Sequence, residues 1–332
     1  MRRLLLPSIL LLLAACAREN PSAPQPTLIV LEAASPATRA YDPDENKITD
    51  YNLLIFNRQG FLEERVYVPA RALKLSGGKV IYRTELLQGA PYIILAAANL
   101  GYELPCHSLE EALQYRYYMA YPDEYTQGMP MAAYLDAAGA NEEGVISVKL
   151  QRLMARIDLN IDRTALSKDV NFKVREVLVG GCPSSAFLFQ NNKVAHNGQL
   201  FINGFQRNGN QVNPLNQDVS LGISGSIRLY LLENCQGDLL ENVETDSGKV
   251  FTEGLYNQVC SYLELRAEYS SGSYHTRPGS RLVYRFYLGE DRNNFDVERN
   301  CIYTITVKPE GSGLSEDSWR VDKSQVVAGS GY

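Results

Sequence analysis

The chain has 332 residues, of which 45% are hydrophobic and 21% charged, so it carries enough apolar material for about two packed domains. A disordered or fibrous protein is excluded on that ground. The formal net charge is −6, from 32 Lys and Arg against 38 Asp and Glu, and no long basic cluster offsets it. That balance argues against a nucleic-acid partner recognised through its phosphates.

The first residues form a lipoprotein signal. A basic pair, Arg2 and Arg3, precedes a short apolar run that ends in Leu-Ala-Ala-Cys at residues 13–16. The run is too short to span a bilayer as a permanent helix, and small residues ahead of a cysteine are typical of a lipobox. The sequence therefore predicts a signal peptide over residues 1–15 and acylation of Cys16. Fatty acyl chains there, palmitate among them, would anchor the mature chain to an outer membrane.

An isolated strand follows the acylated cysteine. Residues 17–26 contain three prolines and no apolar period, which is typical of a tether. Residues 27–31, Thr-Leu-Ile-Val-Leu, then form a strand-like run. A loop of small residues comes next, and its arginine, Arg39, stands directly before Ala40.

The next part of the chain contains several strands and one helix. Apolar and alternating patterns predict strands over 48–56, 61–68, 80–87, 92–98 and 146–150. Turn residues at 57–60 join the first two into a hairpin. The capping box Ser-Leu-Glu-Glu at 108–111 predicts a helix over 112–119.

A tyrosine cluster overlaps this helix and continues past it. It comprises Tyr115, Tyr117, Tyr118, Tyr121 and Tyr125. Aromatic side chains at this density either pack a half-buried helix onto a sheet or form a platform on which a sugar stacks. The sequence favours the packing role.

The C-terminal half is predicted to be all β. Its strands are expected over 157–161, 172–179, 186–189, 227–232, 262–269, 282–288 and 302–307, separated by polar loops such as 203–216. About a dozen strands with one short helix make the fold mainly β. The simplest arrangement is two antiparallel β-sandwiches divided near residue 153, with the helix in the first.

Groups able to support catalysis are sparse. The histidines, His107, His196 and His275, lie far apart, and the cysteines lack the paired spacing of a zinc site. No nucleophile motif accompanies them. The sequence therefore predicts no enzyme, no metal and no cofactor, and it favours single buried thiols over a disulfide framework.

Several stretches carry a family resemblance when taken in their order. They are Ile-Thr-Asp-Tyr-Asn-Leu-Leu-Ile-Phe-Asn at 48–57, Ala-Ala-Ala-Asn-Leu-Gly-Tyr at 96–102, Ala-Tyr-Pro-Asp-Glu-Tyr at 120–125, Met-Pro-Met at 129–131, Leu-Met-Ala-Arg-Ile-Asp-Leu at 153–159, Tyr-Arg-Phe-Tyr-Leu-Gly at 284–289 and Tyr-Thr-Ile-Thr-Val at 303–307. Over most of residues 45–322 the chain resembles the fimbrillin-like lipoproteins. These are subunits of the type V pili of gut and oral anaerobes.

The resemblance implies two transthyretin-like β-sandwich domains, here 40–153 and 154–332. It also implies a non-catalytic pilus subunit that serves adhesion, whose partners are other subunits in a homo- or hetero-polymer. Such subunits reach the outer membrane as lipoproteins and then join a surface pilus.

Assembly in this family proceeds by strand exchange. An Arg-specific protease cuts in the loop after the first strand, and Arg39 followed by Ala40 matches that position. Residues 16–39 would then leave, with a leader strand that includes Leu28, Ile29, Val30 and Leu31. A partner's terminal strand fills the vacated groove by β-augmentation. In this chain the candidate donor strand is the tail 321–332, with Val321, Val326 and Val327.

Two other functions stay open at this stage. One is a monomeric surface lipoprotein that binds a glycan or host ligand, for which the tyrosine cluster would be the platform. The other is an exported hydrolase, which the lack of a catalytic constellation disfavours. Because the valines of the tail do not alternate strictly, stalk, anchor and tip positions in a pilus also stay open.

Overall fold

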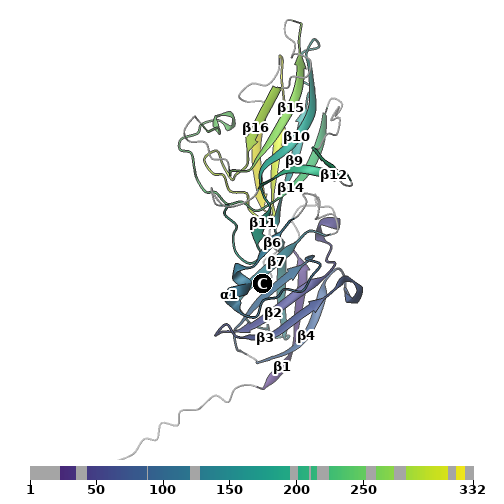
Figure 1. Ribbon diagram of the computed structural model, residues 1–332, viewed down its shortest axis with the longest axis vertical. Coiled ribbons are helices and arrows are strands. Elements are labelled where there is room, and N and C mark those ends of the chain that lie inside the picture. The colour runs from purple at the N-terminus through teal and green to yellow at the C-terminus, as the bar shows by residue number, and fades with distance from the viewer. Residues whose placement is uncertain are drawn as a thin grey trace, which may run out of the picture.

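The computed structural model describes residues 23–34, 43–87, 89–119, 128–194, 201–208, 211–214, 224–251, 259–272, 282–312 and 319–325. Over these residues the chain is mainly β with one α-helix, which confirms the predicted class. The strands form two bodies stacked along the long axis of the molecule (Figure 1). Some predicted functional residues lie outside the described ranges: Cys16, Arg39, Ala40, Tyr121, Tyr125, Val326 and Val327.

A curled sheet builds the first body, with strand order β3-β2-β5-β7-β8-β1-β4. Its strands are β1 Pro24–Ala33, β2 Tyr51–Asn57, β3 Leu62–Val68, β4 Val80–Leu87, β5 Tyr92–Ala98, β7 Met131–Ala138 and β8 Val145–Arg152. β7 and β8 are paired at Met131–Arg152 and Ala132–Gln151 and then separate. The sheet therefore turns at this point, and its two halves face each other across a core.

Alternating side chains from both halves fill that core. They include Ile29 and Leu31 of β1, Ile146, Val148 and Leu150 of β8, Leu53 and Ile55 of β2, and Ile94 of β5. The other face of β2 and β5 is also buried, because Leu54 and Leu95 pack into a second cluster beneath the helix α1 (Leu109–Gln114). Burial on both faces explains why residues 92–98 are apolar throughout.

The helix is shorter than the sequence predicts. Its N-terminus is capped as expected, since the Glu111 N–H donates to the Ser108 hydroxyl over 3.2 Å. It ends at Gln114, and Arg116–Tyr118 form β6, which pairs with β11 (Ser185–Phe187). The predicted helix over 112–119 is therefore wrong beyond residue 114. Aromatic residues favour strands, and a distant partner strand decides between the two states.

Two sheets build the second body, in the orders β13-β12-β10-β15-β16 and β14-β9-β17-β18. The strands are β9 Met154–Asp162, β10 Asn171–Pro183, β12 Phe201–Asn208, β13 Gln211–Pro214, β14 Ser224–Leu232, β15 Tyr262–Ser270, β16 Leu282–Tyr287, β17 Cys301–Val307 and β18 Trp319–Gln325. Short 3-10 helices lie at η1 Pro43–Asn46, η2 Ala70–Ala72 and η4 Asp246–Gly248. The two sheets enclose a core that includes Leu159, Phe172, Leu263, Phe286 and Tyr303.

Some strands of the structure are not predicted by any pattern in the sequence. β12 and β13 form a hairpin where a loop over 203–216 is predicted, because pairing with β10 holds a polar segment that no apolar alternation marks. β7 is alanine-rich, yet it pairs along β5. Two ladders, β1 with β8 and β9 with β17, are parallel, so a purely antiparallel arrangement is wrong there. A period of two is the same in both ladder types, so it cannot separate them.

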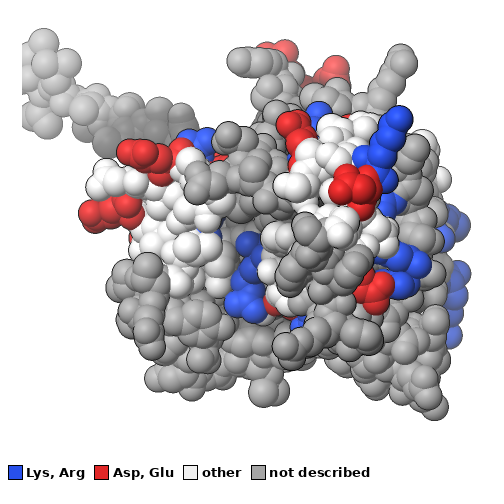
Figure 2. Space-filling model, turned by 90° about the horizontal axis from the view of Figure 1, so that it is seen from above, with Lys and Arg blue, Asp and Glu red and all other residues white. Residues whose placement is uncertain are grey.

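The upper end of the molecule carries charges of both signs (Figure 2). In the view onto the upper end of the molecule, Lys and Arg are interspersed with Asp and Glu over the described residues (Figure 2). Within the described ranges, no helix has the length and apolar character that crossing a membrane requires.

Candidate functional site

The strand β1 lies inside the first sheet, between β8 and β4. It pairs antiparallel with β4 from Pro24–Leu87 to Leu31–Val80, and parallel with β8 from Leu28–Val145 to Ala33–Leu150. The ladder with β8 begins where the Leu28 N–H donates to the Gly144 carbonyl over 2.8 Å. Both edges of β1 are therefore hydrogen-bonded to other strands.

The two faces of β1 differ in burial. Ile29 and Leu31 are fully buried in the core, and Thr27 is 3% exposed. Leu28 and Val30 point the other way and are half-buried on the outer face, where Val30 is opposite Ile81 of β4. The predicted strand residues Leu28 to Leu31 thus alternate between core and surface, as a strand requires.

An ionic row crosses the outer face at the end of β1. The Glu32 carboxylate forms ion pairs with the Lys149 ammonium of β8 and, at 2.8 Å, with that of Lys79, which lies just before β4. Burial by itself raises the pKa of Glu32, but hydrogen bonds to Lys149 and Lys79 and their charges outweigh it and lower the pKa below its usual value. Glu32 is therefore held ionised between two cations.

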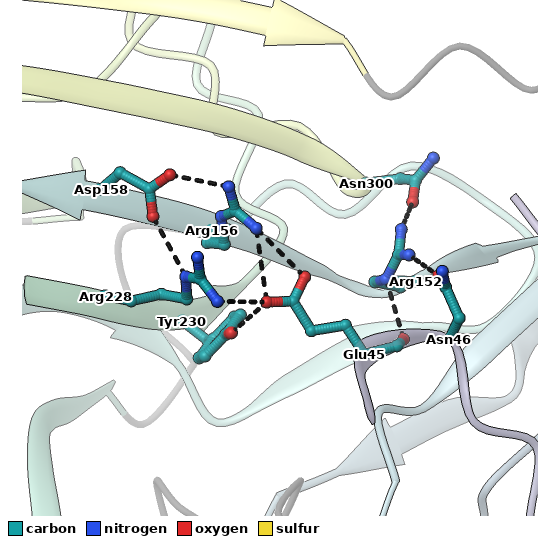
Figure 3. A network of polar contacts seen from close by, with 8 residues as sticks. All are labelled: Glu45, Asn46, Arg152, Arg156, Asp158, Arg228, Tyr230 and Asn300. Carbon is teal, nitrogen blue, oxygen red and sulfur yellow. Dashed lines mark hydrogen bonds and ion pairs between the residues drawn. The ribbon is translucent and has the colours of Figure 1, made fainter. Parts of the chain in front are cut away.

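The chain after β1 re-enters the described structure at the junction of the two bodies. Glu45 of η1 is 4% exposed, and its carboxylate contacts residues of both β9 and β14 (Figure 3). It accepts from the Tyr230 hydroxyl over 2.5 Å and forms ion pairs at 3.3 Å with Arg156 and Arg228. A residue from the first part of the chain thus supplies one of the carboxylates that surround buried Arg156.

Arg152, the last residue of β8, also connects η1 to the second body. Its guanidinium donates to the Glu45 carbonyl over 3.1 Å, to the Asn46 side chain, and to the Asn300 side chain over 2.6 Å (Figure 3). Asp158 completes the network by pairing with Arg156 at 2.7 Å and with Arg228 at 3.4 Å. The set of Glu45, Asn46, Arg152, Arg156, Asp158, Arg228, Tyr230 and Asn300 is called the junction network below.

The described tyrosines of the predicted platform do not share an exposed face. Tyr117 is 7% exposed, Tyr115 packs partly buried against the core beneath α1, and Tyr118 is 68% exposed. The reason is β6, in which successive side chains point to opposite sides. Tyr121 and Tyr125 lie outside the described residues.

The described cysteines are not joined in disulfides, and Cys106, Cys182, Cys260 and Cys301 are buried. Burial raises the pKa of Cys106 to about 11 and that of Cys235 and Cys260 to about 12, so their thiolates are scarce at neutral pH. Within the described part of the chain, no three His, Cys, Asp or Glu side chains are arranged to hold a metal ion.

The candidate donor tail begins inside the second body. Val321 lies in β18, where it is opposite Ile305 of β17. Val326 and Val327 lie outside the described residues. Up to Gln325, therefore, the tail belongs to a sheet of its own chain.

Comparisons with solved structures match nearly the whole chain. A fimbrilin from Porphyromonas gingivalis aligns with 90% of this chain and 96% of its own, at 14% identity and a TM-score of 0.55. The tip fimbrial protein Mfa3 of the same organism, truncated at its C-terminus, aligns with 90% and 99%, at 14% identity and 0.53. The chain has a fimbrillin-like fold. A candidate cell adhesion protein from Bacteroides eggerthii also shares it, with 92% and 97% coverage, 12% identity and 0.53.

One family model also matches part of the sequence. Residues 229–307 match a domain of unknown function, DUF4906. No curated protein matches the chain by sequence. The resemblance seen in the sequence is thus confirmed as a likeness of fold.

Sequence reasoning missed the charged groups of this fimbrillin-like chain. Glu32, Lys79 and Lys149 are far apart in sequence, as are Glu45 and Arg156, and the fold brings them together. The sequence does hold one signal for Glu32, because this acidic residue directly follows an apolar strand.

The two faces of β1 lead to the first prediction. Leu31→Ala should lower the free energy of unfolding by about 2–5 kcal/mol, because it opens a cavity in the core. Val30→Ala, on the outer face of the same strand, should lower it by less than about 1 kcal/mol. Urea unfolding of the non-acylated chain measures both, and equal losses would contradict the burial pattern.

The junction network leads to the second prediction. Glu45→Gln should lower the free energy of unfolding by about 2–3 kcal/mol, since buried Arg156 and the more exposed Arg228 both lose a carboxylate. Glu103→Gln is the matched control, because the Glu103 side chain is 52% exposed in its pair with Arg65. It should change stability by less than about 1 kcal/mol. Thermal unfolding compares the two, and a Glu45→Gln variant as stable as its control would refute the role given to Glu45.

Proposed function

We propose that this chain is a structural subunit of a cell-surface pilus that serves adhesion, and that it assembles by strand exchange after cleavage at Arg39. The observation that carries the proposal is the position of β1. It is an interior strand of its sheet, and its connection to the rest of the protein runs through residues 35–42, which include Arg39. One cut there would release an interior strand with its two ladders.

Loss of β1 would leave a slot that another strand fits. The facing edges of β8 and β4 would both have unpaired backbone groups, and the core positions of Ile29 and Leu31 would be open. Burial of each such side chain contributes about 1.5–3 kcal/mol. A strand from another subunit would restore both the ladders and the core, which is β-augmentation with two edges instead of one.

The remaining parts of the subunit follow the same scheme. The two bodies would be transthyretin-like β-sandwich domains over 40–153 and 154–332, and the switch from β8 to β9 at Leu153 supports that boundary. The tail 321–332 is the proposed donor strand, released from β18 or extending beyond it. The fimbrial and adhesion proteins that share the fold support a structural role without enzymatic activity.

Export would proceed through the lipobox at residues 13–16. Acylated Cys16 would hold the precursor at the outer membrane, and residues 17–26 would place β1 some distance from the lipid. Cleavage at Arg39 then separates the pilus subunit from its anchor. The same cut would therefore open the slot and release the subunit from the membrane.

The third prediction tests strand removal. After limited trypsin treatment and removal of the leader by gel filtration in mild denaturant, the chain that begins at Ala40 should aggregate or form polymers, because its slot is open. Light scattering gives the mass, and sequencing gives the new N-terminus. Arg39→Gln should resist this cut and stay monomeric. A stable monomer that begins at Ala40 would contradict the proposal.

The fourth prediction concerns the anchor. Cys16→Ala should abolish partition of the precursor with outer membranes, because the thiol that carries the acyl chains is missing. Cys106→Ala is the control, since Cys106 is a buried core thiol and should leave partition unchanged. Fractionation of producing cells measures the outcome. Membrane association of the Cys16→Ala chain at the normal level would refute acylation at this site.

A further inference from the structure

We propose that the strand that replaces β1 comes from another pilus subunit and is selected by a carboxylate at the position of Glu32. The inference rests on the proposed function, because it assumes that β1 leaves. It adds a chemical requirement that the incoming strand must meet. The requirement comes from Lys79 and Lys149, which both form ion pairs with Glu32.

Register fixes the three charged groups side by side. Glu32 is the partner of Lys149 in the ladder with β8, and Lys79 directly precedes Val80, the partner of Leu31 in the ladder with β4. The Glu32 side chain is 18% exposed, against 33% for Lys149 and 47% for Lys79. The carboxylate is thus the least exposed member of the row, and it lies between the two ammonium groups.

Departure of β1 removes this carboxylate and leaves both lysines behind. They belong to β8 and to the segment before β4, which stay in the subunit after a cut at Arg39. Two ammonium groups that contacted one carboxylate then flank the open slot and repel each other. A neutral strand would restore the ladders but leave this repulsion, whereas an acidic side chain at the same position would relieve it. Charge complementarity of this kind acts mainly on specificity and on the rate of association.

The carboxylate also sets the register of the incoming strand. A shift by one residue would turn the acid toward the core, where an unpaired charge is strongly unfavourable. A shift by two residues would move it by about 7 Å along the strand, away from both lysines. The slot therefore favours a strand with apolar residues at the positions of Ile29 and Leu31 and with Asp or Glu directly after the second.

The same spacing occurs in β18 of this chain, as Trp-Arg-Val-Asp at residues 319–322. Residues 326–332, Val-Val-Ala-Gly-Ser-Gly-Tyr, contain no Asp or Glu. The nearest acid before them, Asp322, lies in β18 opposite Thr304 of β17. Its donation would require β18 to leave the second body. A second copy of this chain would therefore meet the requirement only with its β18 released, and the occupant is assigned to a donor strand in which an acidic residue directly follows the second core residue.

Peptide binding to the cut protein tests the proposal. Residues 36–39 of the non-acylated chain are replaced by the recognition sequence of a site-specific protease, and the released strand is exchanged for labelled peptides. One peptide has the sequence of residues 23–34, a second carries Glu32→Gln, a third carries Ile29→Asp, and a fourth has the sequence of residues 319–332. Fluorescence anisotropy gives the affinities at low and high salt.

The Glu32→Gln peptide should bind about fivefold to tenfold more weakly than the first at low salt, as expected for two partly exposed ion pairs. The difference should shrink in about 0.5 M NaCl. It should disappear when the protein carries Lys79→Gln and Lys149→Gln. It should persist with Lys74→Gln and Lys168→Gln, the control that removes the same charge at exposed positions that are not partners of β1 in either ladder.

Each of the following results contradicts one part of the proposal. If the first peptide binds no better than the Ile29→Asp peptide, the slot itself is absent and the proposed function fails. If the first two peptides bind equally while Ile29→Asp does not bind, the slot stands and the carboxylate requirement falls. Persistence of the difference in the Lys79→Gln and Lys149→Gln protein also refutes the requirement. The 319–332 peptide carries Asp322 at the same spacing. If it binds equally well to the unchanged protein and to the Lys79→Gln and Lys149→Gln protein, the requirement falls as well.

Discussion

The first body depends on one strand that satisfies two edges and a core at once. β1 completes the ladders of β8 and β4, and Ile29 and Leu31 fill the space between the two halves of the curled sheet. Loss of an edge strand breaks one row of hydrogen bonds. Loss of an interior strand breaks two rows and also removes part of the core. The first body is therefore complete only while some strand occupies that position.

The second body has the same arrangement with a strand that cannot leave. β9 lies between an antiparallel neighbour, β14, and a parallel neighbour, β17, as β1 lies between β4 and β8. β9 follows β8 directly through Leu153, so it is covalently continuous with the chain on both sides. The difference between the two bodies thus lies in chain connection and not in strand pairing.

The junction network keeps the segment after β1 in place. Glu45 binds to β9 and β14 through Arg156, Arg228 and Tyr230, and Arg152 binds its backbone from the end of β8. A chain that begins at Ala40 would keep all these residues. Buried charge of this kind is costly to break by removing one partner. The network can therefore hold η1 and the two bodies together whether or not β1 is present.

The sequence by itself determined the β class, most strands, the helix cap at Ser108 and the isolated run at residues 27–31, because apolar alternation and capping are local patterns. It could not determine that β1 lies between β8 and β4, that Tyr117 and Tyr118 point to opposite sides, or that β12 pairs with β13 and β10. Those outcomes depend on partners distant in sequence. The pairing of Glu32 with Lys79 and Lys149, and of Glu45 with Arg156, was decided by tertiary structure alone, since a charge shows no preference for a partner until the fold brings the two within a few ångströms.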